Sequence, residues 1–74
     1  MKEEIKALLS EALPMVDFDS EFLFSELDSL GVVTILITLS QKYSIQLTMQ
    51  DATPKNLISL DALVRLVESK MQES

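Results

Sequence analysis

The sequence predicts a small all-α protein, a four-helix bundle of three longer helices and one short helix with a long first loop. Three observations support this fold class. Apolar residues recur at helical spacing in three segments, one Gly and two Pro occur in 74 residues, and the hydrophobic fraction is 47%. Such a chain can form one modest core and has few of the turn residues that β-hairpins need. We therefore expect residues 1–74 to form a single domain.

The first helix is predicted over residues 2–13. Apolar residues form one stripe along it: Ile5, Leu8, Leu9, Ala12 and Leu13. Pro14 ends the helix, because the residue before a proline is disfavoured in helical conformation. Residues 14–28 then form the long first loop, which holds five of the twelve acidic residues and no basic residue. Large apolar side chains in this loop, such as Phe18 and Phe22, are expected to pack on the body of the protein.

The second helix is predicted over residues 29–43, with Asp28 or Ser29 as its N-cap. Apolar residues cover more than half of its circumference: Val32, Val33, Ile35, Leu36, Ile37, Leu39 and Tyr43. The remaining narrow arc, which we expect to face solvent, consists of Gly31, Thr34, Thr38, Gln41 and Lys42. A helix this apolar is expected to be the central and most buried element of the bundle.

The segment after the second helix is predicted as a connector over residues 44–50, in which Ile45 and Leu47 alternate inward. Thr53 and Pro54 then predict the start of the short helix, because threonine is a frequent N-cap and proline is favoured at the first helical position. We expect this helix to cover residues 54–57.

The last helix is predicted to start after Ser59, which can serve as its N-cap. Its apolar stripe is Leu60, Leu63, Val64, Val67 and Met71. Asp61 near its start and Lys70 near its end complement the helix dipole.

The composition excludes several classes of function. Twelve acidic residues stand against six basic ones, and the net charge of −6 argues against binding nucleic acid or an anionic membrane surface. The chain has no His and no Cys, which excludes imidazole catalysis, disulfides and zinc–thiolate sites. The acidic residues at positions 17, 19, 21 and 28 follow a calcium-loop spacing, but Phe22 occupies the position that needs glycine. We therefore expect no metal site, no catalytic residue and no enzyme activity.

The sequence also predicts where the protein is found. The first ten residues carry four charges and no apolar core of a signal peptide, and the most apolar stretch, residues 30–39, is too short to span a membrane. We expect a cytoplasmic monomer with no membrane insertion.

Ser29 is the remaining candidate for chemistry. Its hydroxyl lies at the predicted start of the most apolar helix, directly after the acidic loop. It cannot activate itself as a nucleophile, because the chain supplies no suitable base. It can instead be the place where another enzyme attaches a group, and a helix N-terminus favours an attached phosphate. The alternative is that Ser29 is simply part of a helix cap.

The chain resembles an acyl carrier protein along its whole length. The resemblance rests on the segments Asp28-Ser29-Leu30, Ile45-Gln46-Leu47, Thr53-Pro54-Lys55-Asn56-Leu57 and Ser59-Leu60-Asp61-Ala62-Leu63-Val64. It implies that a phosphopantetheinyl transferase attaches 4′-phosphopantetheine from coenzyme A to Ser29. The terminal thiol would then carry an acyl or aminoacyl group as a thioester, which fits a chain that has no Cys of its own. Further partners implied are an adenylate-forming acyl or aminoacyl ligase and an acyltransferase or condensing enzymes.

Two features differ from common fatty-acid carriers. The second helix has one charged residue, Lys42, and residues 25–29 lack the Leu-Gly-x-Asp-Ser lead-in of that group. Residues 27–33 are instead similar to D-alanyl carrier proteins, which accept an amino acid from an adenylate-forming ligase. We therefore predict a specialised carrier of a fatty-acid, polyketide, peptide or aminoacyl pathway. The alternatives are a housekeeping carrier of fatty-acid synthesis and a helical interaction module in which Ser29 is not modified.

Two further sets of residues complete the hypothesis. The residues expected to meet partner enzymes are Glu26, Asp28, Leu30, Gly31 and Thr34. The residues that the resemblance implies as walls for an acyl chain are Val33, Leu36, Leu57, Ala62 and Leu63. The alternative for the second set is an ordinary hydrophobic core.

Overall fold

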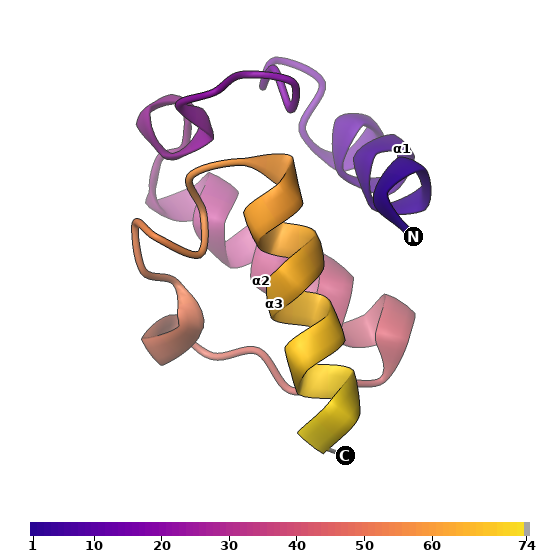
Figure 1. Ribbon diagram of the computed structural model, residues 1–74. Helices are drawn as coiled ribbons and strands as arrows, with labels where there is room; N and C mark the ends of the chain where they lie inside the picture. The colour runs from indigo at the N-terminus through magenta and orange to yellow at the C-terminus, as the bar shows by residue number, and fades with distance from the viewer. Residues whose placement is uncertain (74) are drawn as a thin grey trace.

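Three α-helices and two short 3-10 helices make up the computed structural model, which describes residues 1–73 (Figure 1). The α-helices are α1 (Lys2–Ala12), α2 (Ser29–Tyr43) and α3 (Leu60–Glu73), and the 3-10 helices are η1 (Leu23–Glu26) and η2 (Met49–Asp51). Each α-helix contacts the other two, and residues 1–73 contain no strand. The all-helical fold class is therefore confirmed.

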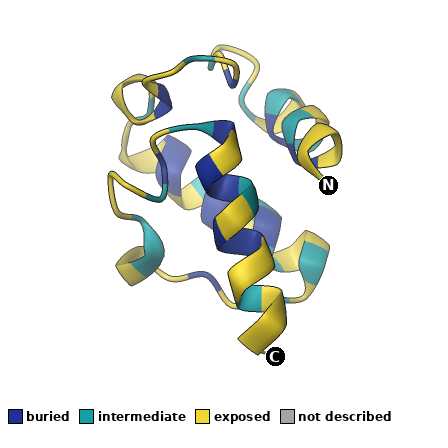
Figure 2. Ribbon diagram, viewed as in Figure 1, coloured by how far each residue is buried: buried dark blue, intermediate teal, exposed yellow. Residues whose placement is uncertain are grey.

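One hydrophobic core lies where the three α-helices meet (Figure 2). Its fully or almost fully buried members are Ile5, Leu9, Phe18, Leu23, Val32, Ile35, Leu36, Leu39, Leu47, Leu57, Leu60, Leu63, Leu66 and Val67. The first loop contributes Phe18 and Leu23, as predicted, but Phe22 is 67% exposed, in contrast to the prediction. On α3, Met71 is 41% exposed and lies outside the core, although the sequence places it on the apolar stripe. α2 and α3 each bury five residues, so α2 is not more buried than α3, in contrast to the prediction.

The ends of the helices follow the local sequence signals closely. The Asp28 carboxylate accepts a 2.7 Å hydrogen bond from the Gly31 N–H, and the Ser59 hydroxyl oxygen accepts one of 3.1 Å from the Ala62 N–H. Both residues are therefore N-caps, as predicted. α1 ends at Ala12, one residue earlier than predicted, because Leu13 before Pro14 leaves the helical region with φ −131° and ψ 72°.

The short fourth helix, expected over residues 54–57, is a single turn. The Asn56 N–H donates to the Thr53 hydroxyl oxygen at 3.1 Å, and the Leu57 N–H donates to the Thr53 carbonyl at 3.1 Å. The turn does not continue into a longer helix, and the Ile58 carbonyl after it accepts a 2.9 Å hydrogen bond from the Leu23 N–H in the first loop. The count of four helices is thus not confirmed, although the predicted N-cap is present.

The orientation of α2 about its axis differs from the prediction. Its buried residues are Gly31, Val32, Ile35, Leu36 and Leu39. Leu30, Val33 and Ile37 are 73%, 37% and 52% exposed, so apolar side chains occupy the solvent face. The predicted solvent arc is therefore wrong at Gly31, whereas Gln41 and Lys42 are exposed as predicted and Thr34 and Thr38 are partly exposed. Because apolar residues surround most of this helix, the pattern alone did not select which side faces the core.

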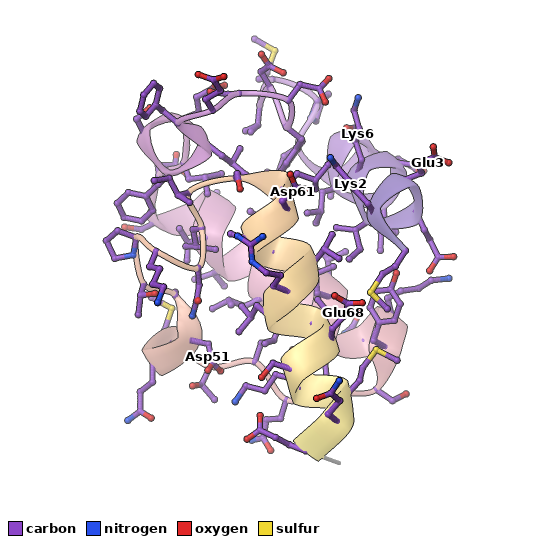
Figure 3. All side chains as sticks on the ribbon, viewed as in Figure 1. Lys2, Glu3, Lys6, Asp51, Asp61 and Glu68 are labelled. Atoms are coloured by element: carbon purple, nitrogen blue, oxygen red, sulfur yellow. The ribbon has the colours of Figure 1, made fainter. Side chains whose placement is uncertain are left out.

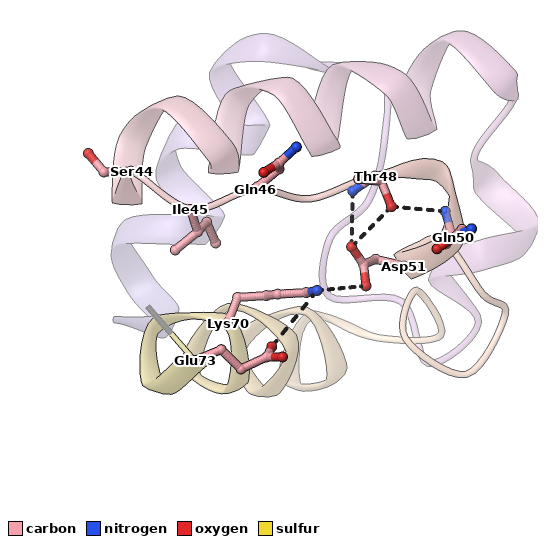
Figure 4. A pocket seen from close by; sticks show the side chains of 8 residues that line it. All are labelled: Ser44, Ile45, Gln46, Thr48, Gln50, Asp51, Lys70 and Glu73. Carbon is pink, nitrogen blue, oxygen red and sulfur yellow. Dashed lines mark hydrogen bonds and ion pairs between the residues drawn. The ribbon is translucent and has the colours of Figure 1, made fainter.

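Hydrogen bonds and an ion pair hold the connector after α2 and the following η2 against the rest of the chain. Ser44 ends the helix in the left-handed region, with φ 54° and ψ 42°. The Leu47 N–H donates to the Ser40 hydroxyl at 3.1 Å, and Leu47 is buried as predicted. η2 was not predicted; Thr48 and Asp51 cap it reciprocally, and Asp51 forms a 3.2 Å ion pair with Lys70 of α3. Figure 4 shows these interactions beside an open polar hollow of about 630 Å³.

A second ion pair joins the other end of α3 to α1. Lys2 and Asp61 point toward each other at 2.9 Å (Figure 3). Both side chains are more than half exposed, so this pair contributes little to stability.

Candidate functional site

Ser29 is the first residue of α2 and is exposed to solvent. Asp28 before it has an extended backbone, and its carboxylate holds the first turn by capping the Gly31 N–H. Within residues 1–73 the Ser29 hydroxyl makes no hydrogen bond. The hydroxyl is therefore free to meet another molecule.

The N-terminal end of α2 also offers unpaired backbone N–H groups. In a helix the first N–H groups have no partner within the helix, and their partial positive charge favours an anion. The Asp28 side chain occupies one of them, that of Gly31. A phosphate ester on the Ser29 hydroxyl would lie next to this positive end, so the residues present fit a phosphate-linked group.

Two acidic residues, Glu26 and Asp28, precede Ser29 in the chain. Glu26 and Asp28 are both exposed. The Glu26 carboxylate accepts a 2.9 Å hydrogen bond from the Asp17 N–H, which folds the first loop back toward α2. Asp19 in the same loop forms a 2.7 Å ion pair with Lys6 of α1, so part of the loop charge is balanced within the chain.

The exposed face of α2 next to Ser29 is apolar. Leu30, Val33 and Ile37 lie at the spacing i, i+3 and i+7, which places them on one side of a helix. Thr34 is partly exposed, and its hydroxyl donates to the Leu30 carbonyl at 2.8 Å instead of projecting a free donor. No charge lies on this side of the helix before its last turn.

The five residues predicted to meet partners therefore divide into two groups. Glu26, Asp28 and Leu30 are exposed beside Ser29, and Thr34 is partly exposed. Gly31 is buried and has no side chain to offer a partner, so its part in partner recognition stays a prediction. A Cβ atom at this position would lie 3.2 Å from the Asp28 carboxylate oxygen, so the glycine leaves room for the Asp28 cap, and 3.9 Å from Leu13, which is an ordinary contact distance.

The structure also contains a hollow that sequence reasoning missed. It has a volume of about 330 Å³ and lies between the end of α1 and the start of α2, lined by residues 12–16, 26–28, 30 and 31. Two sequence signals relate to it, Pro14, which ends α1, and Gly31, which has no side chain. Neither signal identifies the hollow without the tertiary arrangement.

Of the five residues proposed as walls for an acyl chain, four are buried and one is exposed. Leu36, Leu57 and Leu63 belong to the hydrophobic core, and Ala62 is buried on α3. Val33 faces solvent on the other side of α2, because the helix is rotated relative to the prediction. The hollows of about 630 Å³ and 330 Å³ are lined by other residues, and this arrangement is that of an ordinary core.

Two observations concern other types of site. Across residues 1–73, no three His, Cys, Asp or Glu side chains are grouped so that they could hold a metal ion. In the same part of the chain, no helix has the length and apolar character needed to cross a membrane.

Comparison with known proteins gives one match. A family model described as a phosphopantetheine attachment site matches residues 1–67, which include α1, the first loop, α2 and the first half of α3. No curated protein and no solved structure matches the chain.

Proposed function

Because the chain belongs to the phosphopantetheine attachment site family, we propose that it is a carrier protein and that Ser29 is its attachment residue. Members of this family attach 4′-phosphopantetheine as a prosthetic group, and such carrier domains are not catalytic themselves. The observation that carries the assignment to Ser29 is its exposed hydroxyl, which lacks a partner within residues 1–73 and lies at the start of α2.

The attachment requires a separate enzyme and a balanced transfer. The Ser29 oxygen forms a bond to the phosphorus that bears the pantetheine in coenzyme A, and the bond from that phosphorus to the oxygen of adenosine 3′,5′-bisphosphate breaks. A base of the phosphopantetheinyl transferase takes the hydroxyl proton, since this chain has no His or Cys. The attached group then supplies a thiol that can carry an acyl or aminoacyl group as a thioester.

The residues around Ser29 hold its hydroxyl where another enzyme can reach it. Asp28 fixes the first turn of α2, so that the Ser29 hydroxyl stays outside the helix. The positive end of α2 favours the phosphate that links the group to the chain. Glu26 and Asp28 supply negative charge beside the site, which attracts basic partner surfaces and raises encounter rates.

The pathway in which the carrier acts is also part of the proposal. We favour a specialised carrier that is loaded by an adenylate-forming acyl or aminoacyl ligase over a housekeeping carrier of fatty-acid synthesis. The solvent face of α2 supports this choice, because it presents Leu30, Val33 and Ile37 instead of acidic side chains. Enzymes that meet this face therefore need an apolar surface, with basic residues only toward the first loop.

The same apolar face favours a second candidate function. An interaction module would use it to bind a partner helix, without any modification of Ser29. The two functions differ in one observable property, which is whether Ser29 is a substrate of a transferase.

Intact mass measurement after incubation with a broad-specificity phosphopantetheinyl transferase and coenzyme A tests the proposal. We expect the wild type to gain one phosphopantetheine and Ser29→Ala to gain none. Ser25→Ala is the matched control, because Ser25 is also exposed and its hydroxyl donates to the Phe22 carbonyl. No gain on the folded wild type, with a control carrier modified in parallel, would contradict the carrier function and support the interaction module.

A further inference from the structure

The hollow of about 330 Å³ beside Ser29 has no role in the function proposed above. Apart from Glu26 and Asp28, its lining residues are apolar or lack a side chain. Two of them, Met15 and Leu30, are 94% and 73% exposed, so large apolar side chains border an opening to solvent. Exposed apolar surface around a concave site is typical of a place where another molecule binds.

The floor of the hollow is built on the core. Leu13, Val16 and Leu27 are partly buried and pack against the core cluster. Gly31 completes the floor, and a Cβ atom there would lie 3.6 Å from Leu27 and 3.9 Å from Leu13. The hollow therefore has a packed base beneath an open rim.

We infer that this hollow receives an apolar side chain of the phosphopantetheinyl transferase that modifies Ser29, an inference that rests on the proposed function. Asp28 and Leu30, the chain neighbours of Ser29, both line the hollow. An enzyme that forms a bond to the Ser29 oxygen must cover the surface around it, and a standard interface buries roughly 800 Å² per partner. The hollow falls inside that area.

The charges of the lining indicate what surrounds the incoming side chain. Glu26 and Asp28 line the hollow, and none of its lining residues is basic. The Glu26 carboxylate is held in place by the Asp17 N–H at 2.9 Å. The transferase side chain is therefore apolar and has Lys or Arg beside it, in the usual pattern of an apolar anchor with a charged rim.

Filling the hollow is the direct test. Ala12→Phe places a ring at a lining position that is exposed and ends α1, and Ala7→Phe places the same ring on an exposed position of α1 away from the hollow. We expect Ala12→Phe to raise the KM of the transferase by about tenfold, equivalent to about 1.4 kcal/mol. Ala7→Phe is expected to match the wild type, and kcat is expected to be unchanged in both, because the Ser29 hydroxyl is untouched.

A second pair of variants changes only exposed methionines, so a change in KM would not come from a loss of folding. Met15→Gln replaces an apolar side chain with a polar, uncharged one at a 94% exposed lining position, and Met49→Gln makes the same change at a 61% exposed position on η2. We expect only the first to raise the KM. Equal KM values for all four variants and the wild type would overturn the inference while leaving the carrier function intact.

Two other results are distinguishable. A wild type that gains no mass would overturn the carrier function and this inference with it. If the attached group itself occupied the hollow, loading would raise the melting temperature of the wild type, and Ala12→Phe would remove that rise without changing the KM. That result would overturn the inference.

Discussion

The rest of the chain forms hydrogen bonds with side chains at the C-terminal end of α2 and leaves residues at its N-terminal end exposed. At the C-terminal end, the Tyr43 hydroxyl donates a 2.6 Å hydrogen bond to Glu4 of α1, and the Ser40 hydroxyl accepts from the Leu47 N–H. At the N-terminal end, Ser29 is exposed without a partner in residues 1–73, and Leu30 is 73% exposed. One end is closed by contacts within the chain, and the other is left for a second molecule.

The C-terminal end of α2 contributes to the stability of the fold, and the N-terminal end is available for recognition by a partner. The closed end anchors α2 to α1 and to the connector, so the helix is held in position. The open end can then expose the Ser29 hydroxyl and an apolar surface, because its exposed side chains are not needed to hold the helix in place. The three predictions below test whether the two ends differ in this way.

Two leucines on α2 provide the largest expected contrast. Leu39 is fully buried toward the closed end, and Leu30 is 73% exposed at the open end. We expect Leu39→Ala to lower the free energy of unfolding by about 2–5 kcal/mol, because it leaves a cavity in the core. We expect Leu30→Ala to change it by less than about 0.5 kcal/mol. Urea unfolding of both variants measures the contrast, and similar losses would mean that Leu30 is not free.

The titration of Tyr43 tests the contact at the closed end. Burial and the hydrogen bond to Glu4 raise the pKa of Tyr43 from 10.0 to about 12. A raised pKa in the folded state means that this stabilisation is complete below about pH 10 and is lost as the pH rises through about 12. Tyr43 is the only tyrosine and the chain has no tryptophan, so ultraviolet absorbance reports it alone.

We expect the phenolate signal to appear near pH 12 in the folded protein and near pH 10.0 in urea. Glu4→Gln should move the folded midpoint toward the urea value, and circular dichroism at each pH verifies that the chain is still folded. A folded midpoint that already equals the value in urea would contradict the closed end described here.

The smallest expected effect concerns two aspartates, Asp51 on η2 and Asp28 at the start of α2. The Thr48 N–H and Lys70 lower the pKa of Asp51, whose side chain is 17% exposed. We expect Asp51→Asn to lose about 1 kcal/mol of unfolding free energy at pH 7, because it removes the charged partner of Lys70. Asp28→Asn should change it by only a few tenths of a kcal/mol, since asparagine is an equally good N-cap.

The pH dependence sharpens this comparison. A carboxyl whose pKa is lowered by folding stabilises the protein above its ordinary pKa, and that stabilisation is lost as the pH falls through the folded-state value. The difference between wild type and Asp51→Asn should therefore begin to shrink as the pH falls below about 4 and disappear once the pH lies below the lowered pKa of Asp51. Urea unfolding at pH 7 and in acid measures it, and a difference that persists in acid would mean that the Asp51 charge is not its source.

The sequence predicted the local features of the fold well. The three α-helices, the caps Asp28 and Ser59 and the inward Leu47 all follow from signals a few residues long. The turn at residues 54–57 was taken for a helix, because Thr-Pro begins both structures and the hydrogen bond from Leu23 to the Ile58 carbonyl after it comes from a distant segment.

The candidate site was predicted less completely. Ser29 could be singled out because the chain has no His, no Cys and no complete metal-binding pattern. Its role as the attachment residue stays a proposal. The side of α2 that faces solvent could not be predicted, since apolar residues surround most of the helix, and this error placed Gly31 outside and Val33 inside. The hollow beside Ser29 depends on how α1 and α2 approach, which local patterns do not contain.

The 94% exposed thioether of Met15 has a consequence for the protein under oxidising conditions. Oxidants convert methionine to its sulfoxide, which replaces an apolar group with a polar, chiral one and is reversed by dedicated reductases. At Met15 the added oxygen would lie on the apolar lining beside Ser29. A chain without a single cysteine would then still be sensitive to redox conditions, through a thioether at its candidate docking hollow.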